Sequence, residues 1–113
     1  MNKKIVRTLC LGTLVAGVVP QVQAEDLTVN RLLASQCAQC HGTNGHSVGS
    51  IEGLTDESYK DLYEDLTDMR SEDRPENIMD HQALGYTDDQ VRRIAHYFGT
   101  LSGKAGEAPE FKD

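Results

Sequence analysis

The feature that most constrains this chain is a pair of cysteines followed at once by a histidine. Cys37, Cys40 and His41 lie within the stretch SQCAQCHGTNGH. Two cysteines only two residues apart would close a very small loop, so a disulfide between them would stabilise a fold little. We therefore expect these side chains to serve chemistry, as a redox dithiol, a zinc site or the anchor of a cofactor.

The sequence around the cysteines favours the last of these three sites. A redox dithiol opens a helix after a strand, and no strand pattern precedes Cys37. Zinc needs four ligands, usually from two clusters, and the chain has no second cysteine pair. Cys-x-x-Cys-His is the attachment motif of c-type haem, in which both thiols bind the haem and the histidine binds its iron. The motif predicts one covalent haem c, on Cys37 and Cys40, with His41 as an iron ligand.

The first 24 residues differ in kind from the rest and predict export. Residues 2–7 hold three basic side chains, residues 9–19 are apolar, and Val22-Gln23-Ala24 fits the site that signal peptidase reads. The apolar run is too short for a permanent membrane span. We expect residues 1–24 to be a signal peptide, residues 25–102 one domain in the periplasm, and residues 103–113 a flexible tail.

Composition after the signal indicates a small acidic domain that is short of core material. The 89 remaining residues contain no Trp and six Phe and Tyr, and domains of this size often need a cofactor to complete a core. The signal holds three of the 11 Lys and Arg and none of the 18 Asp and Glu, so the formal charge changes from −7 to −10. Such a surface disfavours nucleic acid and anionic membranes and favours a partner with a basic docking surface.

Apolar side chains recur at helical spacing in three segments, residues 27–36, 56–70 and 88–101. This pattern predicts an all-α fold, with three to four short helices wrapped around the haem. The last segment is the best specified, because Thr87 and Gln90 form a capping box before it. Its expected buried face consists of Val91, Ile94, Ala95, Phe98 and Leu101.

For each of the two earlier helices the sequence offers a capping residue and an apolar face. For residues 27–36, Asp26 is the expected cap, and Val29, Leu32 and Leu33 are the expected apolar face. For residues 56–70, Thr55 is the expected cap, and the apolar stripe is Tyr59, Leu62, Tyr63, Leu66 and Met69. Residues 42–53 and 71–85 show no period, so we expect them to be loops that carry function.

A second iron ligand must come from elsewhere in the chain. Met69 lies on a helix stripe and is expected to pack in the core, and His46 follows the haem motif too closely to cross to the other haem face. His96 is expected at an exposed or partly buried helix position. Met79, in the loop before the last helix, is favoured, and His81 in the same loop stays its rival. A His/Met pair would raise the potential of the haem.

The motifs together resemble those of class I cytochromes c. The matching stretches are CAQCHGTNG, VGSIEGL and DLTDMRSEDRPENIMDHQALGYTDDQVRRIAHYF, which cover nearly all of the chain after the signal. Within that family the chain is most similar to the cytochrome subunit of flavocytochrome c sulfide dehydrogenase and its small monohaem relatives. The resemblance implies covalent haem at Cys37 and Cys40, with His41 and Met79 as the proximal and distal iron ligands. It also implies that the last helix crosses the first, with Tyr97 or Phe98 against Leu33.

One departure from the family concerns the support of His41. Many relatives carry a proline after the haem motif, near the backbone carbonyl that orients this histidine, and residues 49–51 contain none. The sequence therefore leaves the hydrogen-bond acceptor of His41 unidentified. Such a contact sets the basicity of the ligand.

The function implied is electron transfer without catalysis. We expect a periplasmic monohaem carrier, working either as a free shuttle or as the electron-accepting subunit of a sulfide-oxidising flavoprotein. A different class of function stays open, that of a haem-based sensor whose Met79 dissociates to admit a ligand.

Overall fold

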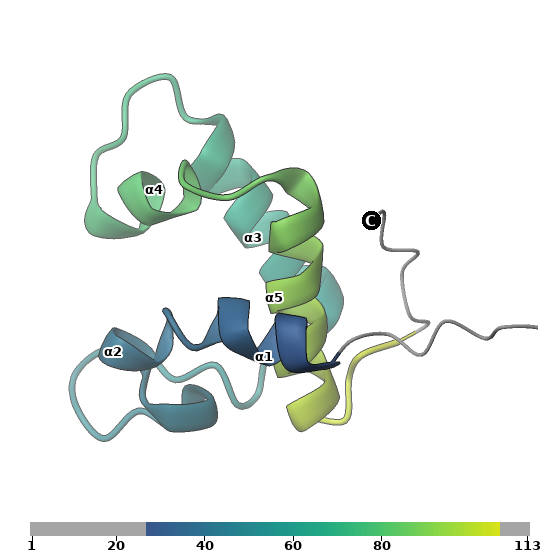
Figure 1. Cartoon of the computed structure of the whole chain (residues 1–113). Coiled ribbons are helices and arrows are strands. Elements are labelled where there is room, and N and C mark those ends of the chain that lie inside the picture. The colour runs from purple at the N-terminus through teal and green to yellow at the C-terminus, as the bar shows by residue number, and fades with distance from the viewer. Residues whose placement is uncertain (1–26, 107–113) are drawn as a thin grey trace, which may run out of the picture.

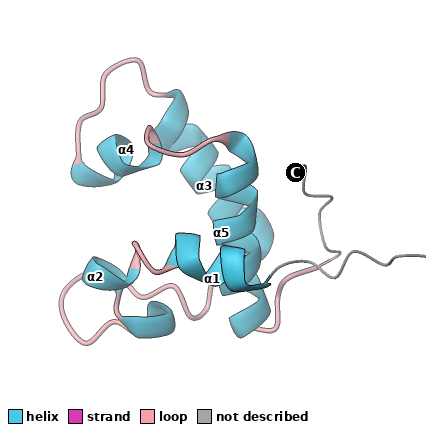
Figure 2. Cartoon of the chain, in the orientation of Figure 1, coloured by secondary structure: helices cyan, strands magenta, loops and turns pink. Residues whose placement is uncertain are grey.

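The computed structural model describes residues 27–106, and within them every regular element is a helix (Figures 1 and 2). In chain order these are α1 (Leu27–Ala34), α2 (Ala38–His41), the 3₁₀ helix η1 (Thr43–Gly45), α3 (Tyr59–Ser71), α4 (Ile78–Ala83) and α5 (Asp88–Leu101). The predicted all-α fold is confirmed, and α2, η1 and α4 are additions to the three predicted helices. The predicted signal peptide and the predicted Asp26 cap lie outside the described residues.

The last helix, α5, forms the centre of the fold and has the predicted bounds. Gln90 N donates to Thr87 Oγ1 (3.3 Å) and Thr87 N to Gln90 Oε1 (2.9 Å), so the predicted capping box is confirmed. The buried face holds Val91, Ile94, Ala95 and Phe98, as predicted. Two expectations for α5 are wrong: Leu101 is exposed, and His96 is buried, with its ring edge-on to that of Tyr59.

The first helix buries a different face from the one predicted. Val29 and Leu32 are exposed, Leu33 is partly buried, and the buried positions are Asn30 and Ala34. Asn30 Oδ1 accepts a hydrogen bond from Arg93 of α5 (3.4 Å). Asn30 and the small Ala34 face α5. Most of the predicted apolar stripe of α1 therefore points away from the core. Figure 1 shows α1 lying across α5, as the resemblance implies.

The middle helix, α3, begins three residues later than predicted and packs on α5 through the predicted stripe. Its cap is Ser58 rather than Thr55, because Ser58 Oγ accepts from Asp61 N (3.2 Å) and donates to the Asp61 carboxylate (2.7 Å). Leu62 and Leu66 of the stripe are buried in the core that they share with α5. Tyr59, Tyr63 and Met69 are partly buried.

Gly99 and the residues after α5 tie the end of that helix to the start of α3. A Cβ at Gly99 would lie 2.9 Å from Tyr59 N, so only glycine permits this approach. Lys104 O accepts from Tyr59 N (3.1 Å), and Lys104 Nζ donates to Asp56 O (2.6 Å). The start of the predicted tail is thus held against α3 at residue 104. The rest of that tail, from residue 107 onward, lies outside the described residues.

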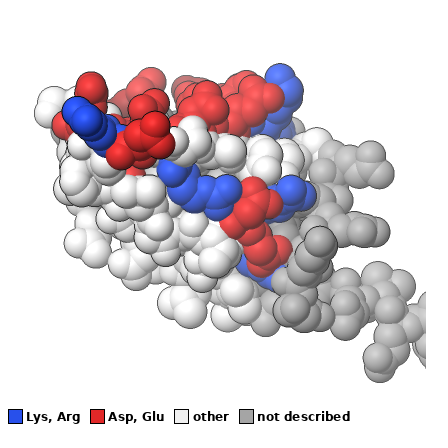
Figure 3. Space-filling model, turned by 90° about the horizontal axis from the view of Figure 1, so that it is seen from above, with Lys and Arg blue, Asp and Glu red and all other residues white. Residues whose placement is uncertain are grey.

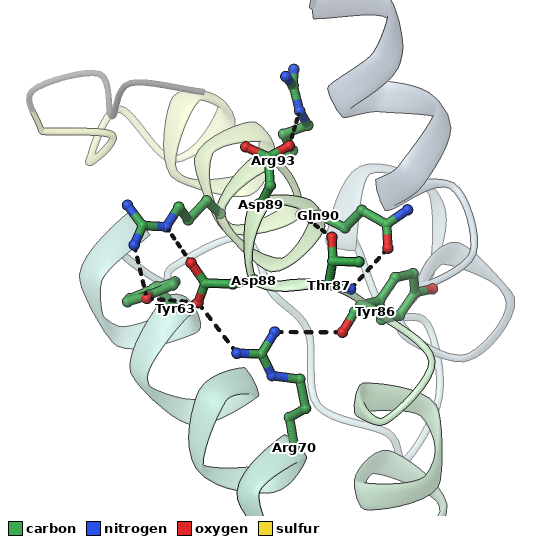
Figure 4. Close-up of polar contacts among 9 residues, drawn as sticks. Tyr63, Arg70, Tyr86, Thr87, Asp88, Asp89, Gln90 and Arg93 are labelled. Atoms are coloured by element: carbon green, nitrogen blue, oxygen red, sulfur yellow. Dashed lines mark hydrogen bonds and ion pairs between the residues drawn. The ribbon is translucent and has the colours of Figure 1, made fainter. Parts of the chain in front are cut away.

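A polar cluster at the start of α5 joins α5 to α3 (Figure 4). Asp88 Oδ1 accepts from Arg70 Nη2 (3.2 Å) and Tyr63 Oη (3.1 Å), and Asp88 Oδ2 accepts from Arg92 Nε (2.8 Å). The Arg92 guanidinium also lies over the Tyr63 ring, 5.3 Å from its centroid. These donors, Arg92 first, hold the pKa of the Asp88 carboxyl below its ordinary value.

None of the helices among residues 27–106 has the length and apolar character needed to cross a membrane.

The lowered pKa of Asp88 predicts a pH-dependent contribution to stability. A carboxyl whose pKa is lowered by folding stabilises the fold above its unfolded pKa of about 3.9, and this contribution is lost as the pH falls below that value. Asp88→Asn should therefore lower the free energy of unfolding at pH 7 by about 0.5–1 kcal/mol, since these ion pairs are partly exposed. Urea unfolding of both proteins checks it. The difference should shrink towards zero in acid, and a constant difference would contradict the expectation.

Candidate haem site

The Cys-x-x-Cys-His motif forms a single helical turn directly after α1. Cys37 precedes α2, and its carbonyl accepts from Cys40 N (3.3 Å) and His41 N (2.9 Å). Both thiols are free, that of Cys37 partly buried and that of Cys40 exposed. Burial raises the pKa of the Cys37 thiol, whereas redox dithiols have a lowered pKa. The turn therefore favours covalent attachment over a dithiol site.

His41 is oriented by a backbone carbonyl that the sequence did not identify. Its Nδ1 lies 2.6 Å from Glu52 O. A carbonyl can only accept, so Nδ1 carries the proton and donates, which leaves the lone pair of Nε2 for a metal. The loop that carries Glu52 is closed by a hydrogen bond in which Leu54 N donates to Gly45 O (2.9 Å). The acceptor lies just after the segment, residues 49–51, where the family's proline is absent.

Gly42 allows the chain to turn directly after His41. Its φ of +81° and ψ of 161° fall in a region that only glycine adopts readily. A Cβ at this position would lie 2.0 Å from His46 O. Gly49, in the same loop, has no heavy atom within 4 Å of such a Cβ. The tight turn at Gly42 brings the loop back towards His41.

An apolar cleft of about 710 Å³, counting its open mouth, lies between the motif and the second half of the chain. One side is formed by Cys37 and His41, and the other by Met69 and Met79. Its apolar floor and walls are Leu54, Leu62, Leu66, Ile94 and Phe98, and its acidic lining residues are Glu52, Glu57 and Asp65. Figure 1 shows α2 and α4, which carry His41 and Met79, on the same side of the molecule.

Met79 lies on a short helix, α4, where the sequence predicted an irregular loop. A capping box starts this helix: Asn77 Oδ1 accepts from Met79 N (2.8 Å) and Asp80 N (3.1 Å), and Asp80 Oδ2 accepts from Asn77 N (3.3 Å). Asp80 Oδ2 also accepts from Glu76 N (2.9 Å). The Glu76 hydrogen bond is the main reason that the pKa of the buried Asp80 carboxyl is lowered. The signal Asn77-x-x-Asp80 is visible in the sequence and could have indicated the helix.

The three histidines considered as rivals lie outside the cleft lining. His81 is exposed on α4, and its Nδ1 lies 2.8 Å from Asn77 O. It is two residues from Met79 and therefore on the opposite face of the helix. His46 is exposed, and His96 is buried against Tyr59. Met69, expected in the core, lines the cleft with Met79, so the structure offers two thioethers.

These residues fit a covalently attached haem. The described part of the chain holds no cluster of three or more His, Cys, Asp or Glu that could bind a bare metal ion. The donors present are two free thiols one turn apart, of which only Cys37 lines the cleft, an imidazole with only Nε2 available, and two thioethers in the cleft lining; they match those of a c-type haem.

Comparisons with known proteins agree with this fit. A family model described as Cytochrome c matches residues 28–102. The cytochrome subunit of sulfide dehydrogenase from Chlorobaculum tepidum is 34% identical over 85 residues, which cover 75% of this chain and 77% of that protein. Cytochrome c-553 of Helicobacter pylori is 30% identical over 87 residues, covering 75% and 91% of the two chains. The thiosulfate dehydrogenase electron acceptor of Stutzerimonas stutzeri is 34% identical over 73 residues, covering 61% of this chain and 34% of that protein.

The turn at Gly42 gives a prediction with a matched control. Gly42→Ala should lower the free energy of unfolding by about 2 kcal/mol or more, because a left-handed residue costs about 1–3 kcal/mol and its Cβ meets a backbone carbonyl. It should also lower the yield of protein with covalent haem, since the turn orders His41. Gly49→Ala should change neither quantity. Thermal unfolding and a haem stain of denatured protein measure them, and equal behaviour of the two variants would contradict the expectation.

Proposed function

The chain belongs to the cytochrome c family, and we propose that it carries single electrons with haem c attached at Cys37 and Cys40 and His41 and Met79 as the iron ligands. The observation that carries this proposal is that Cys37, His41 and Met79, from separate segments, line one apolar cleft. When bound, the haem supplies the one-electron Fe(III)/Fe(II) couple.

Residues around the cleft would set the reduction potential of the haem. The Glu52 carbonyl fixes the tautomer and direction of His41. Methionine opposite histidine raises the potential. Carboxylates at Glu52, Glu57 and Asp65 line the cleft, and their charge favours the more positive oxidised iron. With His41 and Met79 both holding the iron, the haem would have no site left for substrate, which supports a carrier rather than an enzyme.

The proposed partner is a redox protein with a basic face. In Figure 3 carboxylates gather along the upper edge of the face, with basic side chains between and beside them, and the lower left of the face carries neither. The exposed acidic residues of α3 and the segment after it are Asp61, Glu64, Asp65, Asp68, Glu72, Asp73 and Glu76. Exposed apolar side chains follow the motif at Val48 and Ile51 and flank Met79 at Ile78 and Leu84. Together they suit an association that is steered by charge and completed by apolar contact.

The relatives suggest a donor and a compartment. Two of them are named as the cytochrome subunit of sulfide dehydrogenase and the electron acceptor of thiosulfate dehydrogenase. The protein would accordingly accept electrons from a dehydrogenase of a reduced sulfur compound, in the periplasm, to which residues 1–24 would direct it. The exposed apolar residues favour an associated form over a free shuttle. If a flavoprotein co-purifies with the native protein, the role as a subunit is supported. If none co-purifies, the role as a free shuttle is supported.

The two methionines of the cleft make the ligand assignment testable. Met79→Ala should abolish the methionine-to-iron charge-transfer band of the oxidised protein and lower its potential, because the thioether ligand is lost. Met69→Ala should keep the band. Visible spectra and a redox titration measure these effects. The reverse pattern would assign Met69 instead, and a wild-type protein without the band would favour the haem-based sensor.

The acidic surface predicts how charge controls the rate of electron transfer. Reduction of the oxidised protein by a cationic hexaammine complex of ruthenium should slow as ionic strength rises, because salt screens the attraction. Oxidation of the reduced protein by anionic hexacyanoferrate should quicken instead. Stopped-flow absorbance at several salt concentrations measures both rates. Equal salt dependence of the two reactions would contradict a steering role for the surface.

A further inference from the structure

A single arginine joins the two ends of the segment that carries Met79. Arg70 lies in the last turn of α3, and the segment of residues 71–87 follows it. Arg70 Nη1 donates to Tyr86 O (3.4 Å), near the end of the segment, and Arg70 Nη2 donates to Asp88 Oδ1 (3.2 Å), just beyond it. Figure 4 shows Arg70 reaching to both acceptors. Arg70 therefore bridges the base of the segment at two points, one on its last residues and one just beyond them.

The acceptor carboxylate is itself held in place. Asp88 Oδ1 also accepts from Tyr63 Oη (3.1 Å), and Asp88 Oδ2 accepts from Arg92 Nε (2.8 Å). Tyr63 is in turn stacked on Tyr59, with ring centroids 6.0 Å apart. Arg70 thus meets a carboxylate whose position is already set by α3 and α5. The planar guanidinium can bind the carboxylate and the carbonyl at once, which an ammonium group cannot do as well.

Arg70 and Arg92 bind the same carboxylate with different consequences. Arg92 and Asp88 are four residues apart on α5, so their ion pair stays within one helix. Arg70 and Asp88 lie on opposite sides of the segment 71–87. The side chain of Arg70 is 24% exposed and that of Arg92 38%, so neither is fully screened by solvent. Arg92 also contacts α3, because its Nη2 donates to Tyr63 Oη (3.5 Å) and its guanidinium lies over the Tyr63 ring, but it makes no bond to Tyr86 of the kind that Arg70 makes. Arg92→Leu is therefore a control that weakens the α3–α5 contact without removing the bond to Tyr86.

We propose that Arg70 is a positioning residue that closes the base of the segment 71–87 and thereby keeps Met79 on the haem iron. This inference rests on the proposed role of Met79. A segment tied at both ends has fewer conformations to lose when Met79 binds iron, so the bound state is favoured. Without the tie, the segment would populate more arrangements in which the thioether is away from the iron.

The experiment measures how readily an added ligand displaces the methionine. Imidazole is titrated into the oxidised holoprotein at constant pH, and the loss of the methionine-to-iron charge-transfer band gives its apparent Kd. That Kd falls by the factor by which the methionine-off state gains population. Arg70→Leu should lower the Kd about three- to fivefold, the upper part of the range expected for a partly exposed ion pair. Arg92→Leu should leave it within about twofold of wild type.

Two further measurements separate positioning from general stability. Urea unfolding of the holoproteins should place both leucine variants below wild type, while only Arg70→Leu changes the affinity for imidazole. Arg70→Lys, which keeps the charge but loses the two-acceptor geometry, should lower the Kd by an intermediate factor. If Arg70→Leu does not fold, the Kd of Arg70→Lys tests the proposal in its place.

An equal fall in Kd for both leucine variants, or no fall for Arg70→Leu and Arg70→Lys, would overturn the proposal. In that case the charge-transfer band of the wild type would still support Met79 as the ligand. A wild type without the band would overturn the ligand assignment itself and, with it, the role of Arg70.

Discussion

The packing of α5 is the interaction on which the rest of the structure depends. Val91, Ile94, Ala95 and Phe98 are almost completely buried, and both α1 and α3 pack against this helix. The chain runs from α1 directly into the cysteine turn, and from α3 into α4 and Met79. The relative placement of the two sides of the cleft is therefore set by how α1 and α3 each contact α5, since the two sides come from separate segments.

The core on α5 is also the inner wall of the cleft. Leu62, Leu66, Ile94 and Phe98 belong to the core and line the cleft at the same time. In a domain of this size few apolar side chains can be buried by the protein alone. A flat apolar cofactor in the cleft would cover the exposed side of these residues and so complete the core. Haem binding and folding would be coupled for this reason, and a substitution in the cleft wall would act on both.

The parts of the fold that could be predicted are those with a local signal in the sequence. The capping box of Thr87 and Gln90 defined the start of α5, and the cysteine motif defined the cofactor. The face of α1 was predicted wrongly because Asn30 pairs with Arg93, 63 positions along the chain, and no local pattern indicates such a contact. Glu52 was missed because it acts through its backbone carbonyl, which every residue has. The short α4 was missed because apolar periodicity needs more than its six residues, although its capping box was present.

The two sides of the cleft are held by contacts of different range, and this difference bears on function. His41 is oriented by a carbonyl 11 residues away, within one short loop that turns at Gly42. Met79 is carried by a segment whose ends are joined through Arg70 and Asp88, 18 residues apart, by partly exposed charged groups. Salt and acid weaken such an ion pair, whereas salt has little to screen in a hydrogen bond between a ring N–H and a backbone carbonyl. Under the proposed ligation, the methionine side is therefore the one at which the surroundings would alter the binding of the iron, and hence the potential, while the histidine side would keep the haem in place.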